Sequence, residues 1–308
     1  MKIAVIGAGA VGGYFGGRLA EAGHDVTFIV REARFKQLRK AGLVIKSPYG
    51  DVTIAEPKLA LDSREIPECD LVMVAVKNYQ LAGAMPNIRP LVESGARILP
   101  LLNGVEHFSL LTDEFGPEPV LGGMCLIIST LDPDGSIQHT SQLHRIVFGS
   151  LQPSQDDFCL QVRQAWEPAK LAITLSSDIW VDIWEKYAFI TSFSGITTAS
   201  RLSIDQVAAV EATKQIYARA LREMWDLAKA CGANMPDGFT EKHLNGMPKY
   251  PPGSTSSMHQ DFRKGLPLEV ESLQGAAIRL AGRVGVDLAT IRTLYGLIKP
   301  FEKPSSFP

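Results

Sequence analysis

The sequence predicts an α/β N-terminal domain built on a parallel sheet, followed by an all-α C-terminal domain. Over the first half of the chain, short apolar strand patterns alternate with helical patterns. After about Ser176, apolar residues recur at roughly every third or fourth position and strand patterns become rare. A length of 308 residues suits two domains better than one. We therefore expect the first domain to span residues 1–177 and the second to span residues 178–308.

The first elements form a βαβ unit. Lys2–Ile6 is an apolar strand, Ala10–Ala22 is a helix, and Asp25–Val30 is a second strand. Further along the chain, the apolar runs Leu71–Val76 and Arg97–Leu102 continue this alternation. Because helices separate these strands, the sheet should be parallel.

The remaining elements of the first half are expected to complete the same α/β domain. They are a helix starting at Tyr79, a helix over Glu106–Glu114, a hairpin formed by Leu43–Lys46 and Asp51–Ile54, and the strands Val120–Thr130, Ile137–Thr140 and Ile146–Gly149.

The second half is expected to be helical. The apolar spacing predicts helices over Ile179–Ser200, Ile204–Cys231 and Glu269–Gly285. Between the last two, the proline- and glycine-rich segment Met235–Thr255 predicts a loop that lines a site or crosses the surface. The tail Lys299–Pro308 is rich in proline and serine, and we expect it to fray.

Composition narrows the class of function. The formal net charge of -2 and the absence of a basic run argue against a nucleic-acid partner, so small-molecule chemistry is favoured. The apolar N-terminal segment is too short and glycine-rich to span a membrane. The four cysteines, which have no CxxC spacing, predict reduced thiols and a cytoplasmic protein. We expect no metal site, and we expect surface or loop positions for His139, His144, His243 and His259.

Residues 7–12 match the pattern GxGxxG directly between the first strand and the first helix. This context favours a dinucleotide site, because the first glycine makes the tight turn, the second admits the pyrophosphate and the third lets the helix pack on the strand. The helix N-terminus would supply amide donors to the phosphates. The predicted cofactor-binding residues here are Gly7, Ala8, Gly9, Ala10, Val11 and Gly12.

The end of the second strand indicates which dinucleotide is bound. NAD-selective sites usually carry an acidic residue there, whereas this chain carries Arg31. A guanidinium can pair with a 2′-phosphate, with support from Arg34 or Lys36, so we predict NADP(H). The competing interpretation is that Arg31 only begins a solvated helix, with Glu32 beside it weakening the preference.

Two further strand ends carry polar residues. Lys77 and Asn103 each follow an apolar strand, and ligands of open α/β sheets bind at this edge, so both are placed to reach the nicotinamide half and the substrate. A solvated strand end is an equally good interpretation of Lys77, and an Asn-Gly turn competes for Asn103.

Lys186 is a single cation in a mostly apolar helical segment. Its helical neighbours are Ile183, Phe189 and Ile190, together with Asp182. Taken alone, the segment favours a solvated Lys186 that pairs with Asp182 and covers apolar surface with its methylenes.

The segment Ser256–Gly275 is the most polar stretch of the second half. Ser257, Asp261 and Glu269 are candidate site residues within it. For Glu269, capping of the following helix is the competing interpretation, because a carboxylate is favourable at a helix N-terminus.

Four segments in this order resemble the ketopantoate reductase family, a member of the 6-phosphogluconate-dehydrogenase-like group: GAGAVG, VAVKNYQ, LLNGVE, and a Lys-bearing helix followed by SSMHQD and a later glutamate. The resemblance runs from Met1 to about Lys299 and implies a Rossmann-type domain plus a helical domain. It also implies NADPH-dependent reduction of a 2-keto acid, 2-dehydropantoate, to pantoate in pantothenate biosynthesis.

The same resemblance implies roles for individual residues. Lys186 corresponds to the catalytic lysine, which an apolar cleft would hold against the substrate carbonyl, and Glu269 to the carboxylate that pairs with the substrate hydroxyl. Asn103 and Ser257 correspond to substrate-site residues, and Asn103 also borders the cofactor. The resemblance assigns the 2′-phosphate to Arg31 and makes Lys77 the family's strand-end lysine.

Two positions depart from the family pattern. Ile190 and Ser194 stand where the family usually has asparagines that hold the substrate, and Ser194 can replace only part of one. This motivates a second hypothesis, a reductase of the same fold that acts on a more apolar 2-keto acid. A third hypothesis is a protein that binds NADPH without turnover. The long apolar helical half is compatible with a homodimer or with a buried substrate cleft.

Overall fold

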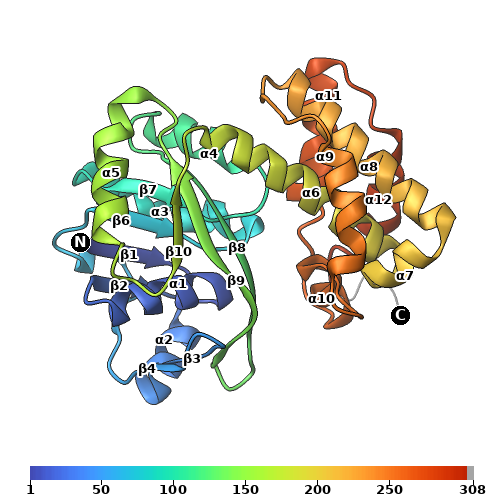
Figure 1. The fold of residues 1–308 in the computed structure, drawn as a ribbon. Helices are drawn as coiled ribbons and strands as arrows, with labels where there is room; N and C mark the ends of the chain where they lie inside the picture. Colours follow the sequence, from blue (N-terminus) through green and yellow to red (C-terminus); the bar gives the residue numbers. More distant parts are fainter. Residues whose placement is uncertain (304–308) are drawn as a thin grey trace. The chain divides into compact units, whose positions relative to one another are not determined.

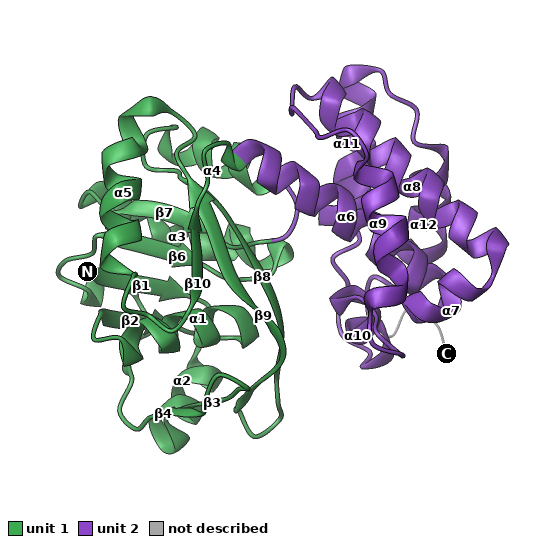
Figure 2. Cartoon of the chain, in the orientation of Figure 1, with its two compact units in different colours: residues 1–102, 107–179 green, residues 103–106, 180–308 purple. Residues whose placement is uncertain are grey.

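The computed structural model describes residues 1–303, and the chain divides into two compact units (Figure 2). The first unit contains Met1–Leu102 and His107–Ile179, and the second contains Asn103–Glu106 and the chain from Trp180 onward. The short segment Asn103–Glu106, which follows a strand of the first unit, thus makes its contacts with the second. The domain boundary predicted at residues 177/178 remains a proposal.

The first unit contains a five-stranded sheet in which all strands are parallel (Figure 1). Its order is β5-β2-β1-β6-β7, so β1 lies in the centre. The strand β5 was not predicted from the sequence. The strands are β1 (Lys2–Ile6), β2 (Asp25–Ile29), β5 (Lys58–Ala60), β6 (Leu71–Val74) and β7 (Arg97–Pro100). The predicted α/β class of the N-terminal part is confirmed.

A second five-stranded sheet is built around β9, which pairs with three other strands. The sequence predicts two short strands here, but β9 is continuous, because β8 pairs with it in antiparallel fashion along most of its length. The strand β10 was not predicted. The strands are β3 (Leu43–Lys46), β4 (Val52–Ile54), β8 (Gly122–Leu131), β9 (Ile137–Gly149) and β10 (Ala172–Leu175).

Helix α1 (Ala10–Glu21) packs against strands of both sheets. It does so because its packing faces carry glycines. A Cβ atom at Gly16 would lie 2.7 Å from a ring carbon of Phe28 in the first sheet, and one at Gly17 would lie 2.6 Å from Cδ1 of Ile45 in the second. The other helices of this part of the chain are α2 (Glu32–Ala41), α3 (Leu81–Glu93), α4 (Glu106–Phe115) and α5 (Asp156–Ala165).

The second unit is helical, as predicted, and α8 packs against four other helices of the unit. The helices are α6 (Ile179–Ser200), α7 (Ile204–Ala209), α8 (Glu211–Ala230), α9 (Phe239–Gly246), α10 (Ser257–Arg263), α11 (Ala276–Val284) and α12 (Ala289–Ile298). A π-helix (Glu271–Gly275) leads into α11.

Three details of the second unit differ from the prediction. The expected helix Ile204–Cys231 breaks at Val210, whose backbone is extended (φ -114°, ψ 116°). The expected loop Met235–Thr255 contains α9, because burial of Phe239 and Thr240 stabilises a short helix between the prolines. In the tail expected to fray, Lys299–Phe301 forms a 3₁₀ helix, and residues 304–308 lie outside the described residues.

Within residues 1–303, none of the helices combines the length and apolarity needed to span a bilayer.

Candidate active site

The glycine loop has the shape that the sequence predicts. Gly7 has φ +97°, a left-handed conformation that favours glycine, and its N–H donates to the carbonyl of Ile29 at 3.2 Å. A Cβ at Gly12 would lie 2.1 Å from the Gly7 carbonyl oxygen, whereas a Cβ at Gly9 would have no atom within 4 Å. The loop is therefore closed on the strand side and open above Gly9. This open face at the N-terminus of α1 fits a bound pyrophosphate.

Two side chains fix the backbone of this loop. Arg34 Nε donates to the carbonyl of Ala8 at 2.9 Å, and Ser129 Oγ donates to the carbonyl of Ala10 at 3.1 Å. The Arg34 guanidinium also donates to the carbonyl of Gly135, in the turn between β8 and β9, at 3.0 Å. Burial lowers the pKa of Arg34. In this arrangement Arg34 holds the glycine loop. The sequence had suggested only that Arg34 supports Arg31 at a 2′-phosphate.

Arg31 lies at the N-terminal boundary of α2 and is exposed. Its acidic neighbour Glu32 pairs with Lys36 at 2.6 Å, one turn further along the helix. The carboxylate that was expected to weaken a 2′-phosphate site thus has another cation beside it. Since both side chains of this pair are more than two-thirds exposed, the pair is weak.

Lys77 follows β6, which lies next to β1 in the sheet. The backbone N–H of Lys77 donates to Gln80 Oε1 at 3.2 Å and so begins a short 3₁₀ helix (Asn78–Gln80). Val76, the preceding residue, borders the glycine loop, because a Cβ at Gly7 would lie 2.9 Å from Val76 Cγ1. The sheet therefore brings Lys77 and the glycine loop to the same edge.

Asn103 and Glu269 meet in the second unit. Asn103 Nδ2 lies 3.5 Å from Glu269 Oε2. Gly104 has φ +89°, as an Asn-Gly turn requires, and a Cβ at this position would lie 2.7 Å from the carbonyl oxygen of Ser272. The Asn-Gly turn and the proposed site role of Asn103 are thus compatible.

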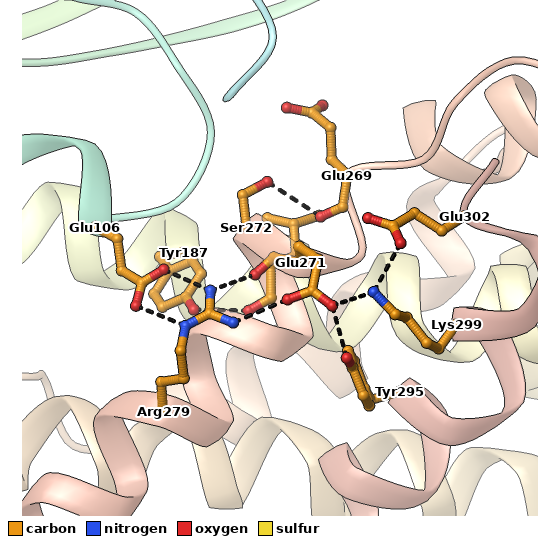
Figure 3. A network of polar contacts seen from close by, with 10 residues as sticks. Glu106, Tyr187, Glu269, Glu271, Ser272, Arg279, Tyr295, Lys299 and Glu302 are labelled. Atoms are coloured by element: carbon orange, nitrogen blue, oxygen red, sulfur yellow. Dashed lines mark hydrogen bonds and ion pairs between the residues drawn. The ribbon is translucent and has the colours of Figure 1, made fainter. Parts of the chain in front are cut away.

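Glu269 is 4% exposed and is not the solvated first residue of a helix. Its carbonyl accepts hydrogen bonds from the N–H of Leu273 at 3.0 Å and from Ser272 Oγ at 3.1 Å, so its backbone begins the π-helical segment. Figure 3 shows its side chain extending away from the neighbouring ion pairs. The Glu269 backbone therefore takes part in the first turn of this segment, while its carboxylate extends away from the ion pairs.

Lys186 lies on α6 and is partly buried, next to the fully buried Tyr187. The Tyr187 hydroxyl donates to the carbonyl of Leu273 at 2.7 Å. Burial raises the pKa of Tyr187 well above its usual value, so this hydroxyl remains a donor. One turn further along, Gln274 Nε2 donates to the carbonyl of Thr191 at 2.7 Å. Two hydrogen bonds thus join the part of α6 that carries Lys186 to the segment that follows Glu269.

The structure places Ser194 in the packing between α6 and the π-helix. Ser194 is 3% exposed, its hydroxyl donates to the carbonyl of Ile190, and it lies 3.4 Å from Gln274 Nε2. Ile190 itself is partly buried. The Ser194 hydroxyl therefore donates within its own helix, and its predicted contact with the substrate stays a prediction.

Ser257 and its neighbour have different surroundings. Ser257, the first residue of α10, is exposed, whereas Ser256 is buried. Ser256 Oγ accepts from the N–H of His259 at 3.1 Å and lies 2.9 Å from Thr197 Oγ1. Ser256 caps the helix and attaches it to α6, which leaves Ser257 as the residue that faces outward.

A network of ion pairs that the sequence does not predict adjoins Glu269 (Figure 3). We call it the Arg279 network; its members are Arg279, Glu106, Glu271, Tyr295, Lys299 and Glu302. Arg279 Nε and Nη2 donate to the two carboxylate oxygens of Glu106 at 3.0 and 2.6 Å, and Nη1 donates to Glu271 Oε2 at 2.8 Å. These partners are far apart in sequence, so no local pattern indicates them.

Charge compensation is strong within this network. Burial alone would raise the pKa of the Glu271 carboxyl. Hydrogen bonds from Lys299, Tyr295 and Arg279 outweigh burial and lower this pKa to about 2. The bidentate pair with Glu106 raises the pKa of Arg279. Glu271, Arg279 and Lys299 are therefore ionised at neutral pH. The pKa of Tyr295 is raised, chiefly by burial and then by Glu271, so its hydroxyl keeps its proton.

The histidine prediction is wrong for three of the four residues. His139, His144 and His259 are buried, and His243 is partly buried. The rings of His139 and His144 stack 5.9 Å apart, across the register shift in the pairing of β9 with β8 that lies between these two residues. Within residues 1–303, no group of three or more His, Cys, Asp or Glu side chains is arranged to hold a metal ion.

Known proteins match this chain over nearly its whole length. The family models described as ketopantoate reductase PanE/ApbA and its C-terminal domain match residues 3–153 and 178–302. The chain is 35% identical to an uncharacterized oxidoreductase, YkpB of Bacillus subtilis, with 98% of this chain and 99% of the relative covered.

Two solved structures extend this comparison. The 2-dehydropantoate 2-reductase of Geobacter metallireducens matches with a TM-score of 0.89 and 27% identity, covering 97% of this chain and 99% of that one. D-mandelate dehydrogenase, solved with NADH and anilino(oxo)acetate, shares the fold at a TM-score of 0.87 and 21% identity, with 98% of each chain covered. The chain therefore belongs to the ketopantoate reductase PanE/ApbA family of NADP(H)-dependent oxidoreductases that act on a CH–OH group.

Proposed function

We propose that this chain reduces the ketone of 2-dehydropantoate to the alcohol pantoate, with NADPH as the reductant. The observation that carries the proposal is the approach of Asn103 Nδ2 to Glu269 Oε2, on a segment that hydrogen bonds tie to the part of α6 bearing Lys186. An amide and a carboxylate can orient a hydroxylated 2-keto acid, and an ammonium group can protonate its reduced carbonyl.

The first unit would hold the cofactor. The open face above Gly9 fits the pyrophosphate, and the exposed Arg31 is placed to pair with a 2′-phosphate. Lys77, at the same sheet edge, would approach the nicotinamide half. When bound, NADPH supplies the hydride that reduces the ketone.

Lys186 would act on the charge that develops on the substrate. A ketone that accepts a hydride becomes an alkoxide, and an ammonium group in a partly buried, mostly apolar setting stabilises that charge better than one in bulk water. Lys186 then donates a proton from Nζ to the alkoxide oxygen and is left neutral until it regains a proton from solvent. The alternative, a solvated Lys186 that pairs with Asp182, predicts instead that replacement of Lys186 leaves turnover unchanged.

Glu269 and Asn103 would orient the substrate. A carboxylate that is 4% exposed retains a strong preference for a hydrogen-bond donor, and the hydroxyl of 2-dehydropantoate offers one. The Asn103 amide would restrain that carboxylate or donate to the substrate. Ser257, exposed at the start of α10, would add a further hydroxyl contact.

A second candidate function is the reduction of a more apolar 2-keto acid. It is favoured by Ile190, which offers no polar group, and by Ser194, whose hydroxyl is used within α6. The fold alone does not decide between the two candidates, because D-mandelate dehydrogenase shares it.

A substrate panel separates these candidates. NADPH consumption is followed with 2-dehydropantoate and with 2-ketoisovalerate, which lacks the hydroxyl, and each reaction is repeated with NADH. The proposal expects kcat/KM for 2-dehydropantoate with NADPH to be the highest of the four by about tenfold or more. Equal values for the two acids would favour the second candidate. Binding of NADPH with no turnover of either acid would overturn both.

Cytoplasmic location and a homodimer remain predictions. The four cysteines are free thiols, which is the state expected in a reducing compartment. Light scattering at two protein concentrations tests the dimer directly.

A further inference from the structure

The Asn103–Glu269 contact is long for a hydrogen bond. At 3.5 Å it lies at the outer limit for a donor and acceptor, so it contributes little to fixing the position of its two residues. Asn103 follows a strand end, and the segment that carries it, Asn103–Glu106, has no regular secondary structure before α4 begins. A stronger interaction joins the same segment to the π-helix.

Arg279 makes this interaction. Its guanidinium binds both carboxylate oxygens of Glu106, the last residue of the segment, at 3.0 and 2.6 Å. With its remaining donors it binds Glu271 at Oε2 and at the backbone carbonyl, both at 2.8 Å. Glu271 begins the π-helix, two residues after Glu269. One planar group therefore spans the two segments whose residues, Asn103 and Glu269, face each other.

Steric contact sets the distance between the Asn103–Glu106 segment and the π-helix, which Arg279 joins. A Cβ at Gly104 would lie 2.7 Å from the carbonyl oxygen of Ser272, so the backbones of the two segments are already in close contact. The guanidinium prevents them from separating, and the missing side chain of Gly104 allows them to approach.

We propose that Arg279 is a positioning residue for the keto-acid site: by joining Glu106 to Glu271, it holds the Asn103 amide against the Glu269 carboxylate. The role requires the forked geometry of arginine, because a lysine ammonium cannot bind two oxygens of Glu106 and two of Glu271 at once. The consequence for activity rests on the proposed function, whereas the position of the segment does not.

Lys299 supplies a matched control. It belongs to the same network and also pairs with Glu271, but its other partner is Glu302 and not the Asn103–Glu106 segment. Lys299→Gln therefore weakens the charge compensation of Glu271 without cutting the link to Glu106. Arg279→Lys keeps the charge and loses the fork.

The test combines hydrogen exchange with kinetics on the full-length protein. In Arg279→Lys, we expect backbone amides of the Asn103–Glu106 segment to exchange about tenfold faster than in the wild type. Relative to the wild type, we expect kcat/KM for 2-dehydropantoate to fall about tenfold, while the Kd for NADPH stays within about twofold. Lys299→Gln should leave both the exchange and kcat/KM within about twofold.

Combination with Asn103→Ala shows whether Arg279 acts through Asn103. If it does, Arg279→Lys lowers kcat/KM by less than about twofold once Asn103 has been replaced. Multiplicative effects of the two substitutions would overturn the proposal, as would unchanged exchange of the segment in Arg279→Lys. If the wild type reduces neither acid of the panel, the proposed function fails, and the exchange experiment still decides whether Arg279 positions the segment.

Discussion

The Tyr187 hydroxyl donates a hydrogen bond of 2.7 Å to the carbonyl of Leu273, although the two residues are 86 positions apart in the chain. Tyr187 directly follows Lys186, and Leu273 lies in the π-helix that begins two residues after Glu269. The bond therefore relates the helix that carries the proposed proton donor to the segment that carries the proposed substrate carboxylate. A π-helix at this point fits the tendency of such turns to occur at functional sites.

Replacement of Glu269 by Gln tests the substrate carboxylate. The amide keeps the size of the side chain and removes its charge, so a charged hydrogen bond to the substrate hydroxyl becomes a neutral one. We expect kcat/KM for 2-dehydropantoate to fall about 10- to 100-fold. The Kd for NADPH, measured by fluorescence, should not change, because the glycine loop belongs to the other unit.

Glu302→Gln is the control for this substitution. Glu302 pairs with Lys299, away from the Asn103–Glu269 contact, so loss of its charge should leave kcat/KM within about twofold. Equal losses in Glu269→Gln and Glu302→Gln would remove Glu269 from the substrate site.

Arg31→Ala tests the choice of cofactor. Loss of a charge-assisted bond to the 2′-phosphate should raise KM for NADPH about 10- to 100-fold and leave KM for NADH nearly unchanged. Lys40→Ala, at an exposed position of the same helix, controls for the general loss of positive charge. An equal rise in KM for NADPH and for NADH would show that Arg31 does not bind the 2′-phosphate.

Ile190→Asn tests the departure from the family pattern. An amide at this partly buried position would restore a polar partner for the substrate, so we expect the ratio of kcat/KM for 2-dehydropantoate over 2-ketoisovalerate to rise about tenfold. Ile190→Leu keeps the apolar character and should leave the ratio unchanged. A lower ratio in the asparagine variant would show that Ile190 contacts an apolar part of the substrate.

His243 should make stability depend on pH. Its ring stacks on Phe189 at 4.6 Å and packs on Phe239 at the same distance, and burial, followed by Lys242, lowers its pKa from 6.5 to about 4. Between these two values the unfolded chain binds a proton that the folded chain does not. Stability from this residue is therefore fully present above pH 6.5 and declines as the pH falls toward 4.

The free energy of unfolding declines by at most about 1.4 kcal/mol per pH unit because of His243, and partial solvent access to the ring reduces this value. Urea unfolding at several pH values measures it. His243→Phe should flatten the profile in this interval, because the aromatic stack is kept and the titrating group is lost. The lowered pKa values of His139 and His144 act in the same direction and remain in both proteins. An unchanged slope in His243→Phe would contradict the assignment.

The sequence was most informative where structure is local. The first strand, the glycine loop and α1 were predicted because strand alternation, three glycine spacings and helix periodicity all act over a few neighbouring residues. Lys77 was placed correctly at a strand end for the same reason. Family resemblance added Lys186 and Glu269, which composition and spacing alone left as surface or capping residues.

The contacts that arrange the candidate site were not predictable in this way. Arg279 and Glu106 are 173 residues apart, and their pairing depends on how the π-helix meets the segment before α4. The stacking of His139 on His144 was missed because the register shift between them depends on the pairing of β9 with β8, and not on the residues of β9 alone. Likewise α9 forms between proline-rich segments because Phe239 is buried, and burial is a property of the whole unit.

In the proposed reaction, Lys186 is the group that stabilises and protonates the reduced carbonyl. Its most direct test is the rate of NADPH consumption with saturating 2-dehydropantoate in the wild type, in Lys186→Ala and in Lys242→Ala, an exposed lysine that pairs with Glu185. We expect Lys186→Ala to lower kcat by about 100-fold or more, with the Kd for NADPH unchanged and with Lys242→Ala close to wild type. A Lys186→Ala protein that binds NADPH and turns over at the wild-type rate would contradict the assignment.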